Sequence, residues 1–321
     1  MEYGLQTNHF GAAIFWSYNV AALGLTTVVL HTLATLQPSR DGSREPRQRT
    51  QIFVALAAVS FSTLSFNMLN VLIQSYTQWP ERFPSAYDRS QHSMIDNIWT
   101  WSATSTLFRD FGEAIVADEA RYLWVLSALM GTFSVCLYMA TEGRRRSIPR
   151  LWAFFALSQI LPISFAQNLF YIAILRQPAK AQPVIVRSLP NAGVLLVYSL
   201  LLSVAPRAGQ TSTLMPLIIL ARLLLVMPLF LVQSSGTGSK HLEYLSRLQR
   251  PVAVAAGLLI VRQAFLALQE SSLTEIGTVL VGHPAVSALG VDMIITVLSL
   301  GAWMYNGPGV ESHSSNEAKR R

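Results

Sequence analysis

The sequence is poor in charged residues and has almost no cysteine. Of its 321 residues, 13% are charged, six are His and one is Cys. The single Cys136 lies in an apolar run, so an internal disulfide and a cysteine-based metal cluster are excluded. The HExxH, GxSxG, Walker and GxGxxG motifs are missing, as are the Asp-rich DDxxD and NDxxD pairs that hold a diphosphate through magnesium. We therefore expect no metal site and no cofactor.

Apolar residues are abundant instead. They make up 51% of the chain, and the mean hydropathy is +0.38. A bilayer-spanning helix needs about 20 apolar residues. On that measure the sequence predicts an all-α, polytopic membrane bundle of eight or nine helices in one domain, 1–310, with a disordered polar tail at 311–321. The nine predicted spans are 13–36, 51–77, 98–117, 121–141, 151–175, 191–206, 214–233, 251–269 and 285–305.

The basic residues indicate membrane topology rather than nucleic-acid binding. The net charge is +7, but Lys and Arg cluster at the ends of apolar segments, as the positive-inside rule expects. With nine spans and an external N-terminus, 14 Lys and Arg fall on the cytosolic side, 7 on the other side and 3 within spans. The run at 143–150 then lies on the wrong side. If 98–117 did not cross, every later segment would invert, so the rule favours a crossing there.

The predicted span 98–117 is unusual because it contains Arg109, Asp110 and Glu113. Charged side chains are costly in lipid and normally face a bundle interior. Asp110 and Glu113 share one helix face, and Arg109 can pair with Glu113 four residues on. We expect these side chains to face an enclosed, largely dry chamber. They form either a structural ion pair or a proton source, since an acid in such a chamber can stay protonated.

Amides form a second set of embedded polar residues. Asn67, Asn70 and Gln74 lie on one stripe of the span 51–77. They either line a cavity or hydrogen-bond between helices at about 1 kcal/mol each.

The span 151–175 carries amides as well. Gln159, Gln167 and Asn168 surround Pro162, which breaks the helical hydrogen-bond ladder near mid-membrane. A cavity lining and a kink satisfied by neighbouring helices are both consistent with this pattern. Asp292 is a further acid inside a span, and we expect it to pair structurally with Arg222 or Arg262.

Three segments resemble a known family. LFRDFGEAI at 107–115, RYLW at 121–124 and EGRRRSIPRLWAFFALSQILPISFAQNLFYIAIL at 142–175 resemble the small integral-membrane terpene cyclases of fungal meroterpenoid pathways, of the ascochlorin and ascofuranone cyclase type. The resemblance covers the middle third of the chain. It implies metal-free cyclisation of a farnesyl chain that bears a terminal epoxide and is attached to an aromatic polyketide. It also implies a partner epoxidase and an endoplasmic-reticulum membrane.

The embedded polar residues fit that chemistry. Asp110 or Glu113 would protonate the epoxide, with Arg109 as the neighbouring charge. The ligands would be a lipophilic prenylated aromatic substrate and the lipid bilayer. The residues expected to contact the substrate are Asn67, Asn70, Gln74, Trp101, Trp124, Gln159, Gln167 and Asn168. The alternatives are a transporter that uses Arg109, Asp110, Glu113 and Asp292 as a relay, a receptor-like scaffold, and an isomerase that protonates a double bond.

Overall fold

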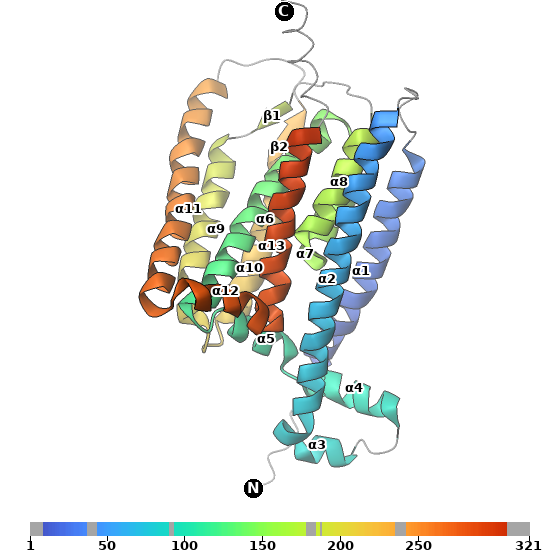
Figure 1. Ribbon diagram of the computed structural model, residues 1–321, viewed down its shortest axis with the longest axis vertical. Helices are drawn as coiled ribbons and strands as arrows, with labels where there is room; N and C mark the ends of the chain where they lie inside the picture. The colour runs from blue at the N-terminus through green and yellow to red at the C-terminus, as the bar shows by residue number, and fades with distance from the viewer. Residues whose placement is uncertain are drawn as a thin grey trace, which may run out of the picture.

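The computed structural model describes residues 9–36, 44–89, 93–177, 184–186, 188–234 and 242–306. This part of the chain is helical apart from two three-residue strands (Figure 1). The elements are α1 (His9–Thr35), α2 (Arg44–Arg82), α3 (Pro84–Arg89), α4 (Met94–Thr104), α5 (Leu107–Ile115), α6 (Glu119–Arg145), α7 (Leu151–Ile160), α8 (Ile163–Arg176), β1 (Val184–Val186), α9 (Ser188–Ala208), α10 (Leu214–Leu231), β2 (Val232–Ser234), α11 (Leu242–Glu270), α12 (Leu273–Gly282) and α13 (Pro284–Asn306). The predicted tail, 311–321, lies outside the described residues.

Seven helices among the described residues are long and apolar enough to cross a bilayer. They contain the segments Gly11–Thr35, Gln48–Arg82, Glu119–Arg145, Leu189–Ala208, Leu214–Leu231, Arg250–Glu270 and Pro284–Tyr305. The prediction of an all-α, polytopic membrane bundle is therefore confirmed. Seven of the nine predicted spans correspond to these helices, and the other two, 98–117 and 151–175, do not.

The bundle has two distinct ends. The helices α3, α4, α5 and α12 lie at one end, which we call the lower face (Figure 1). The other end, where α6 and α8 finish and the strands β1 and β2 lie, is the upper face. The strands pair antiparallel, with Ile185 opposite Gln233. One large hydrophobic core joins the long helices, from Val29 of α1 to Ala285 of α13.

The predicted span 98–117 is wrong, because the chain there forms two short helices. Ser105, between α4 and α5, has an extended backbone with φ −70° and ψ 150°. At about 1.5 Å per residue, α4 and α5 are each only about 15 Å long, half the thickness of a bilayer core. The buried side of α4 packs on α2, where the indole nitrogen of Trp79 donates to the Thr104 hydroxyl at 2.8 Å. The apolar content of this segment reflects packing between helices at the lower face.

The predicted span 151–175 is also wrong as a crossing, since both of its ends lie at the upper face. Arg150, just before α7, donates to the Thr32 hydroxyl at 3.3 Å. Arg176, the last residue of α8, donates to the carbonyl of Leu33 at 2.7 Å. Thr32 and Leu33 are neighbours near the upper end of α1. The segment therefore enters and leaves at the same face, and we call α7 and α8 the re-entrant hairpin.

The tip of the re-entrant hairpin lies about halfway down the bundle. The Tyr18 hydroxyl of α1 donates to the carbonyl of Ile160, the last residue of α7. Tyr18 precedes Thr32 by 14 residues, which is about 21 Å along the helix. The turn falls at Leu161, whose backbone is extended with φ −106° and ψ 175°. This conformation follows from Pro162, which disfavours a helical residue before it and has no N–H to continue the ladder.

The seven-helix arrangement changes the charge count. In the sequence, the segments that join or follow the upper helix ends contain 17 Lys and Arg, against five for the lower ends. The lower five are Arg82, Arg89, Arg109, Arg121 and Arg207. The prediction that Arg144, Arg145, Arg146 and Arg150 lie on the less basic side is wrong. By the positive-inside rule, this arrangement predicts a cytosolic upper face.

Cysteine labelling tests the re-entrant hairpin. We replace Cys136 by Ser and introduce Ser147→Cys before α7 and Gln177→Cys after α8, one at a time. Both thiols should react with a membrane-impermeant maleimide from the same side of sealed vesicles, because both positions lie at the upper face. Labelling is measured as a gel shift.

Gln210→Cys serves as the reference for the lower face, where it is exposed after α9. It should react only from the opposite side. If Ser147→Cys and Gln177→Cys reacted from opposite sides, the segment would cross the membrane and the hairpin would be disproved.

Candidate functional site

A buried carboxylate holds the tip of the re-entrant hairpin. Asp292 of α13 accepts the backbone N–H of Ile163 at 2.9 Å and that of Ser164 at 3.0 Å, which are the first two residues of α8. It also accepts the Ser164 hydroxyl at 2.5 Å. The Ser164 hydroxyl is in turn hydrogen-bonded to that of Ser60 on α2. Three distant segments thus meet at this point.

These contacts solve a problem that the hairpin creates. The first N–H groups of a helix have no partner within it, and an unsatisfied backbone group in hydrocarbon costs several kcal/mol. The preceding residue is Pro162, whose side chain offers no cap. A carboxylate from another helix is a suitable replacement, because it accepts two N–H groups and matches the positive end of the helix dipole.

Arg222 of α10 is a basic residue whose charge is near enough to interact with Asp292. It is half-buried in a predicted span that the structure confirms as a long apolar helix. It lies within electrostatic range of Asp292, Cys136, Tyr198 and Tyr18. Among the described residues Arg222 forms no ion pair within 4 Å. We call Asp292, Ser164, Ser60, Arg222 and Gln159 the polar centre.

Amide oxygens on the re-entrant hairpin are left without donors. Gln167 donates to the Tyr171 hydroxyl at 2.7 Å, and Asn168 donates to the Ser164 carbonyl and to the Ser299 hydroxyl. Gln159 donates to the Ser158 hydroxyl at 3.1 Å. The side-chain oxygens of Gln159, Gln167 and Asn168 are buried and accept no hydrogen bond from the described residues. Each of these amides therefore keeps one unpaired acceptor in the interior.

Aromatic rings lie beside these amides. The rings of Tyr171 and Trp303 are stacked at 4.4 Å with an interplanar angle of 2°, and Phe53 of α2 packs on both at 5.1 and 5.7 Å. Tyr138 of α6 meets Tyr171 edge-on at 5.9 Å. These contacts fix the position of α8 against α2, α6 and α13.

Arg109, Asp110 and Glu113 do not lie in an enclosed chamber, and that prediction is wrong. Arg109 pairs with Glu113 at 2.6 Å, with side chains 57% and 37% exposed. Asp110 pairs with Arg82 of α2 at 2.7 Å, with the Asp110 side chain 36% exposed. The hydrogen bond with Glu113 raises the pKa of Arg109 above its usual value. The charges are tolerated because α5 lies at the lower face and not within a span.

The other predicted substrate residues are scattered. Asn67 and Asn70 are half-buried on the lower half of α2, and Gln74 is exposed. Trp101 is buried between α1 and α2, where its indole donates to the Ser75 hydroxyl at 3.2 Å. Trp124 donates to the Ile276 carbonyl at 2.9 Å and so connects α6 with α12. Gln159, Gln167 and Asn168 all lie on the re-entrant hairpin, where each contacts different residues, and the others lie elsewhere.

Sequence reasoning missed Ser60 and Ser164 and assigned Asp292 only an arginine partner. The available signal was Pro162 followed by Ser164, because a helix start inside an apolar segment requires an external acceptor. The described residues contain no group of three or more His, Cys, Asp and Glu side chains placed to hold a metal ion.

Comparisons of the chain with known protein families, curated proteins and solved structures find no match. The fold and the polar centre define a multi-pass membrane protein with an interrupted, re-entrant helix pair.

The role of Asp292 in holding the hairpin can be tested by Asp292→Asn. Asn keeps the shape of the side chain but removes the charge and replaces one acceptor oxygen with a donor. We expect the free energy of unfolding to fall by about 2 kcal/mol, the usual contribution of a charge-assisted hydrogen bond. Denaturant unfolding of the purified protein in detergent measures this.

Glu270→Gln is the matched control, since Glu270 is an exposed acid at the end of α11. It should change stability by less than about 0.5 kcal/mol. Equal stability of Asp292→Asn and Glu270→Gln would show that the carboxylate does not hold the hairpin.

Proposed function

We propose that this chain is a terpene cyclase of the endoplasmic-reticulum membrane. Its substrate would be a farnesyl chain that bears a terminal epoxide and is attached to an aromatic polyketide. A partner epoxidase would supply that epoxide. The proposal starts from the resemblance of 107–115 and 142–175 to membrane cyclases of fungal meroterpenoid pathways. In the structure these segments form α5, the end of α6 and the re-entrant hairpin.

One observation carries the proposal: the segments with the resemblance gather along the same inner helices. Gly112 of α5 packs on α10 so closely that a Cβ would lie 3.2 Å from the side chains of Leu214 and Ile218. Arg222, one turn above Ile218 on the same helix, lies within electrostatic range of Asp292 at the hairpin tip. α5 therefore packs against α10, the helix that carries Arg222, at a level below the polar centre.

The proposed reaction is an isomerisation and needs no co-reactant. A carboxylic acid donates its proton to the epoxide oxygen while the C–O bond to the more substituted carbon breaks. The π electrons of a neighbouring double bond form the new C–C bond. The final cation loses a proton to a carboxylate or is trapped by a hydroxyl of the substrate, which then releases its proton.

Asp110 and Glu113 are the acids that we assign to the proton transfer. Asp292 is buried and accepts three donors of the hairpin, so Asp292 positions rather than reacts. Asp110 and Glu113 keep about a third of their side chains accessible. A substrate at this face can therefore contact either carboxyl group directly, as proton transfer requires.

The free amide oxygens of the hairpin fit the rest of the substrate. Gln159, Gln167 and Asn168 each have a buried acceptor without a donor, and a phenolic hydroxyl of the aryl group could supply one. Contacts of this kind would orient the ligand, because a buried acceptor gains a hydrogen bond only when the ligand is correctly placed.

A turnover assay tests the proposal. Microsomes that contain the chain receive an epoxyfarnesyl phenol or the corresponding farnesyl phenol without the epoxide. Only the epoxide should give a cyclic product of unchanged mass, and EDTA should not alter the rate. Asp110→Asn and Glu113→Gln should each lower product formation at least about 100-fold, the usual contribution of a general acid. Glu270→Gln is the control.

Mass spectrometry identifies the products, and immunoblotting confirms equal amounts of each variant. Full turnover by both Asp110→Asn and Glu113→Gln would remove these acids from the mechanism. Absence of any cyclic product from the unaltered chain would contradict the function itself.

A transporter is the second candidate, and the re-entrant hairpin favours it specifically. Interrupted helices whose ends meet near the midplane hold ions and substrates in several transporter folds. Asp292 would be the midplane relay residue, and Asp110 and Glu113 would stand at the lower entrance. Proton flux into proteoliposomes, followed with a pH-sensitive dye and lost in Asp292→Asn, would support the transporter and oppose the cyclase.

A further inference from the structure

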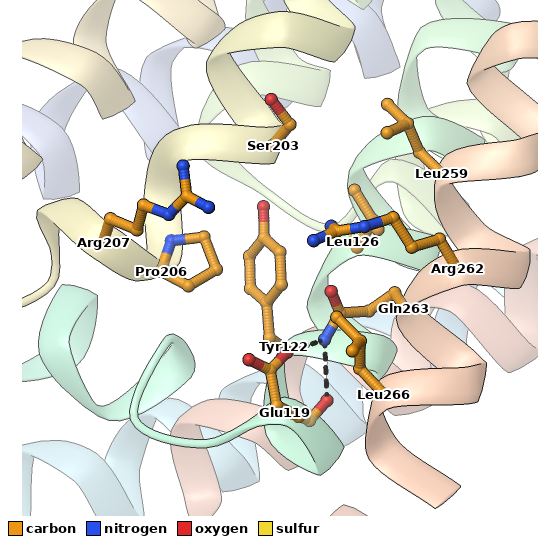
Figure 2. A pocket seen from close by; sticks show the side chains of 10 residues that line it. All are labelled: Glu119, Tyr122, Leu126, Ser203, Pro206, Arg207, Leu259, Arg262, Gln263 and Leu266. Atoms are coloured by element: carbon orange, nitrogen blue, oxygen red, sulfur yellow. Dashed lines mark hydrogen bonds between the residues drawn. The ribbon is translucent and has the colours of Figure 1, made fainter. Parts of the chain in front are cut away.

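A second polar site lies between α6, α9 and α11, apart from the polar centre. It is a pocket of about 100 Å³ near the lower ends of these helices. Figure 2 shows the ring of Tyr122 in its middle, with Arg207 of α9 and Arg262 of α11 reaching in from opposite sides. The remaining lining residues are Glu119, Leu126, Ser203, Pro206, Leu259, Gln263 and Leu266.

The other polar groups of the pocket are already engaged. The side-chain nitrogen of the buried Gln263 donates to Glu119 twice, to its carboxylate at 2.5 Å and to its backbone carbonyl at 3.1 Å (Figure 2). The Tyr122 hydroxyl donates to the carbonyl of Leu202. Glu119 and Tyr122 therefore shape the pocket and leave its centre to the two guanidinium groups.

Arg207 and Arg262 are uncompensated. Neither forms an ion pair or a hydrogen bond with the described residues, although both line one small pocket. Two cations that share a pocket repel each other, and their only acidic neighbour in the lining, Glu119, is held by Gln263. Arg262 also belongs to an apolar helix long enough to cross a bilayer, where an arginine is costly unless it serves a site.

We infer that this pocket binds a phosphate group, with Arg207 and Arg262 as its ligands. Guanidinium groups donate to phosphate in a bidentate manner, and two of them neutralise one dianion. The volume suits a single small anion, since pockets for drug-sized ligands measure about 300–1,000 Å³. It is too small for a prenyl chain, so the site is separate from the proposed cyclase chemistry and does not depend on it.

The position at the lower helix ends suggests two sources for the phosphate. Glu119 is the first residue of α6 and Arg207 is the next to last of α9, so the pocket lies where lipid headgroups meet a bundle. The exposed surface of Arg207 and Arg262 would let a lipid phosphate enter while its acyl chains stay outside. A free phosphate ion or phosphomonoester would make the same contacts.

Binding measurements on the full chain in detergent test the inference. Native mass spectrometry measures adducts of phosphatidic acid, with diacylglycerol as the lipid without phosphate. A thermal shift with inorganic phosphate measures the free anion. Arg207→Gln and Arg262→Gln should each weaken phosphatidic acid binding about tenfold. Arg250→Gln, an exposed site on the upper part of the same helix α11, should leave it unchanged.

The two binding measurements distinguish a lipid headgroup from a free phosphate ion. Binding of phosphatidic acid alone identifies a lipid headgroup site, and binding of both ligands shows that the phosphate group suffices. Arg262→Lys keeps the charge but loses the planar guanidinium group, so it should lose less affinity for phosphatidic acid than Arg262→Gln. This second variant keeps the test valid if Arg262→Gln fails to fold. Unchanged affinity in the Arg207 and Arg262 variants, an equal loss in Arg250→Gln, or no binding of either ligand would overturn the inference.

Discussion

The architecture depends on the contact between Asp292 and the first turn of α8. A helix that begins in the middle of an apolar bundle leaves N–H groups that water cannot reach. Asp292 accepts two of them and the Ser164 hydroxyl as well. Without this acceptor, residues 151–176 would have to continue as one helix through the bilayer or leave the bundle. The re-entrant path of residues 151–176 therefore depends on one carboxylate.

The polar groups of the molecule are sorted by depth. The polar centre lies at the level of the hairpin tip. In this low-dielectric environment, neutral amides and a hydrogen-bonded carboxylate cost less free energy to bury than an unpaired charge. Ion pairs with half-exposed partners, such as Arg109 with Glu113, lie at the lower face. The pocket of Arg207 and Arg262 also lies near that face.

The sequence predicted the class of fold well and its path less well. Hydropathy identified all seven long helices, because a 20-residue apolar run has few alternatives to a span. It could not distinguish a crossing from a re-entrant pair at 151–175, since the same residues are apolar in both. The clue was Pro162 beside Ser164, and its meaning depended on Asp292, some 130 residues away. The two wrong crossings also cancelled each other, so only α6, which lies between them, was predicted with the wrong orientation, and every helix after residue 176 kept the predicted one.

The site was harder to predict because burial depends on tertiary contacts. Gln159, Gln167 and Asn168 were found from their apolar surroundings, and their side-chain oxygens are indeed buried. Arg109, Asp110 and Glu113 looked buried only because a span was assumed around them. The pairing of Asp110 with Arg82, 28 residues earlier, has no local signature. The pocket was missed for the same reason, since its lining comes from three separate helices.

The order of synthesis gives the Asp292 contact a further consequence. The hairpin occupies the middle of the chain, but the residue that satisfies it belongs to α13, the last of the seven long helices. A ribosome delivers the hairpin to the membrane well before its acceptor exists. Until α13 is inserted, the first N–H groups of α8 lack their acceptor, so the hairpin must be held by a chaperone or stay at the membrane interface. Final assembly of the interior is thus a late, post-insertion event.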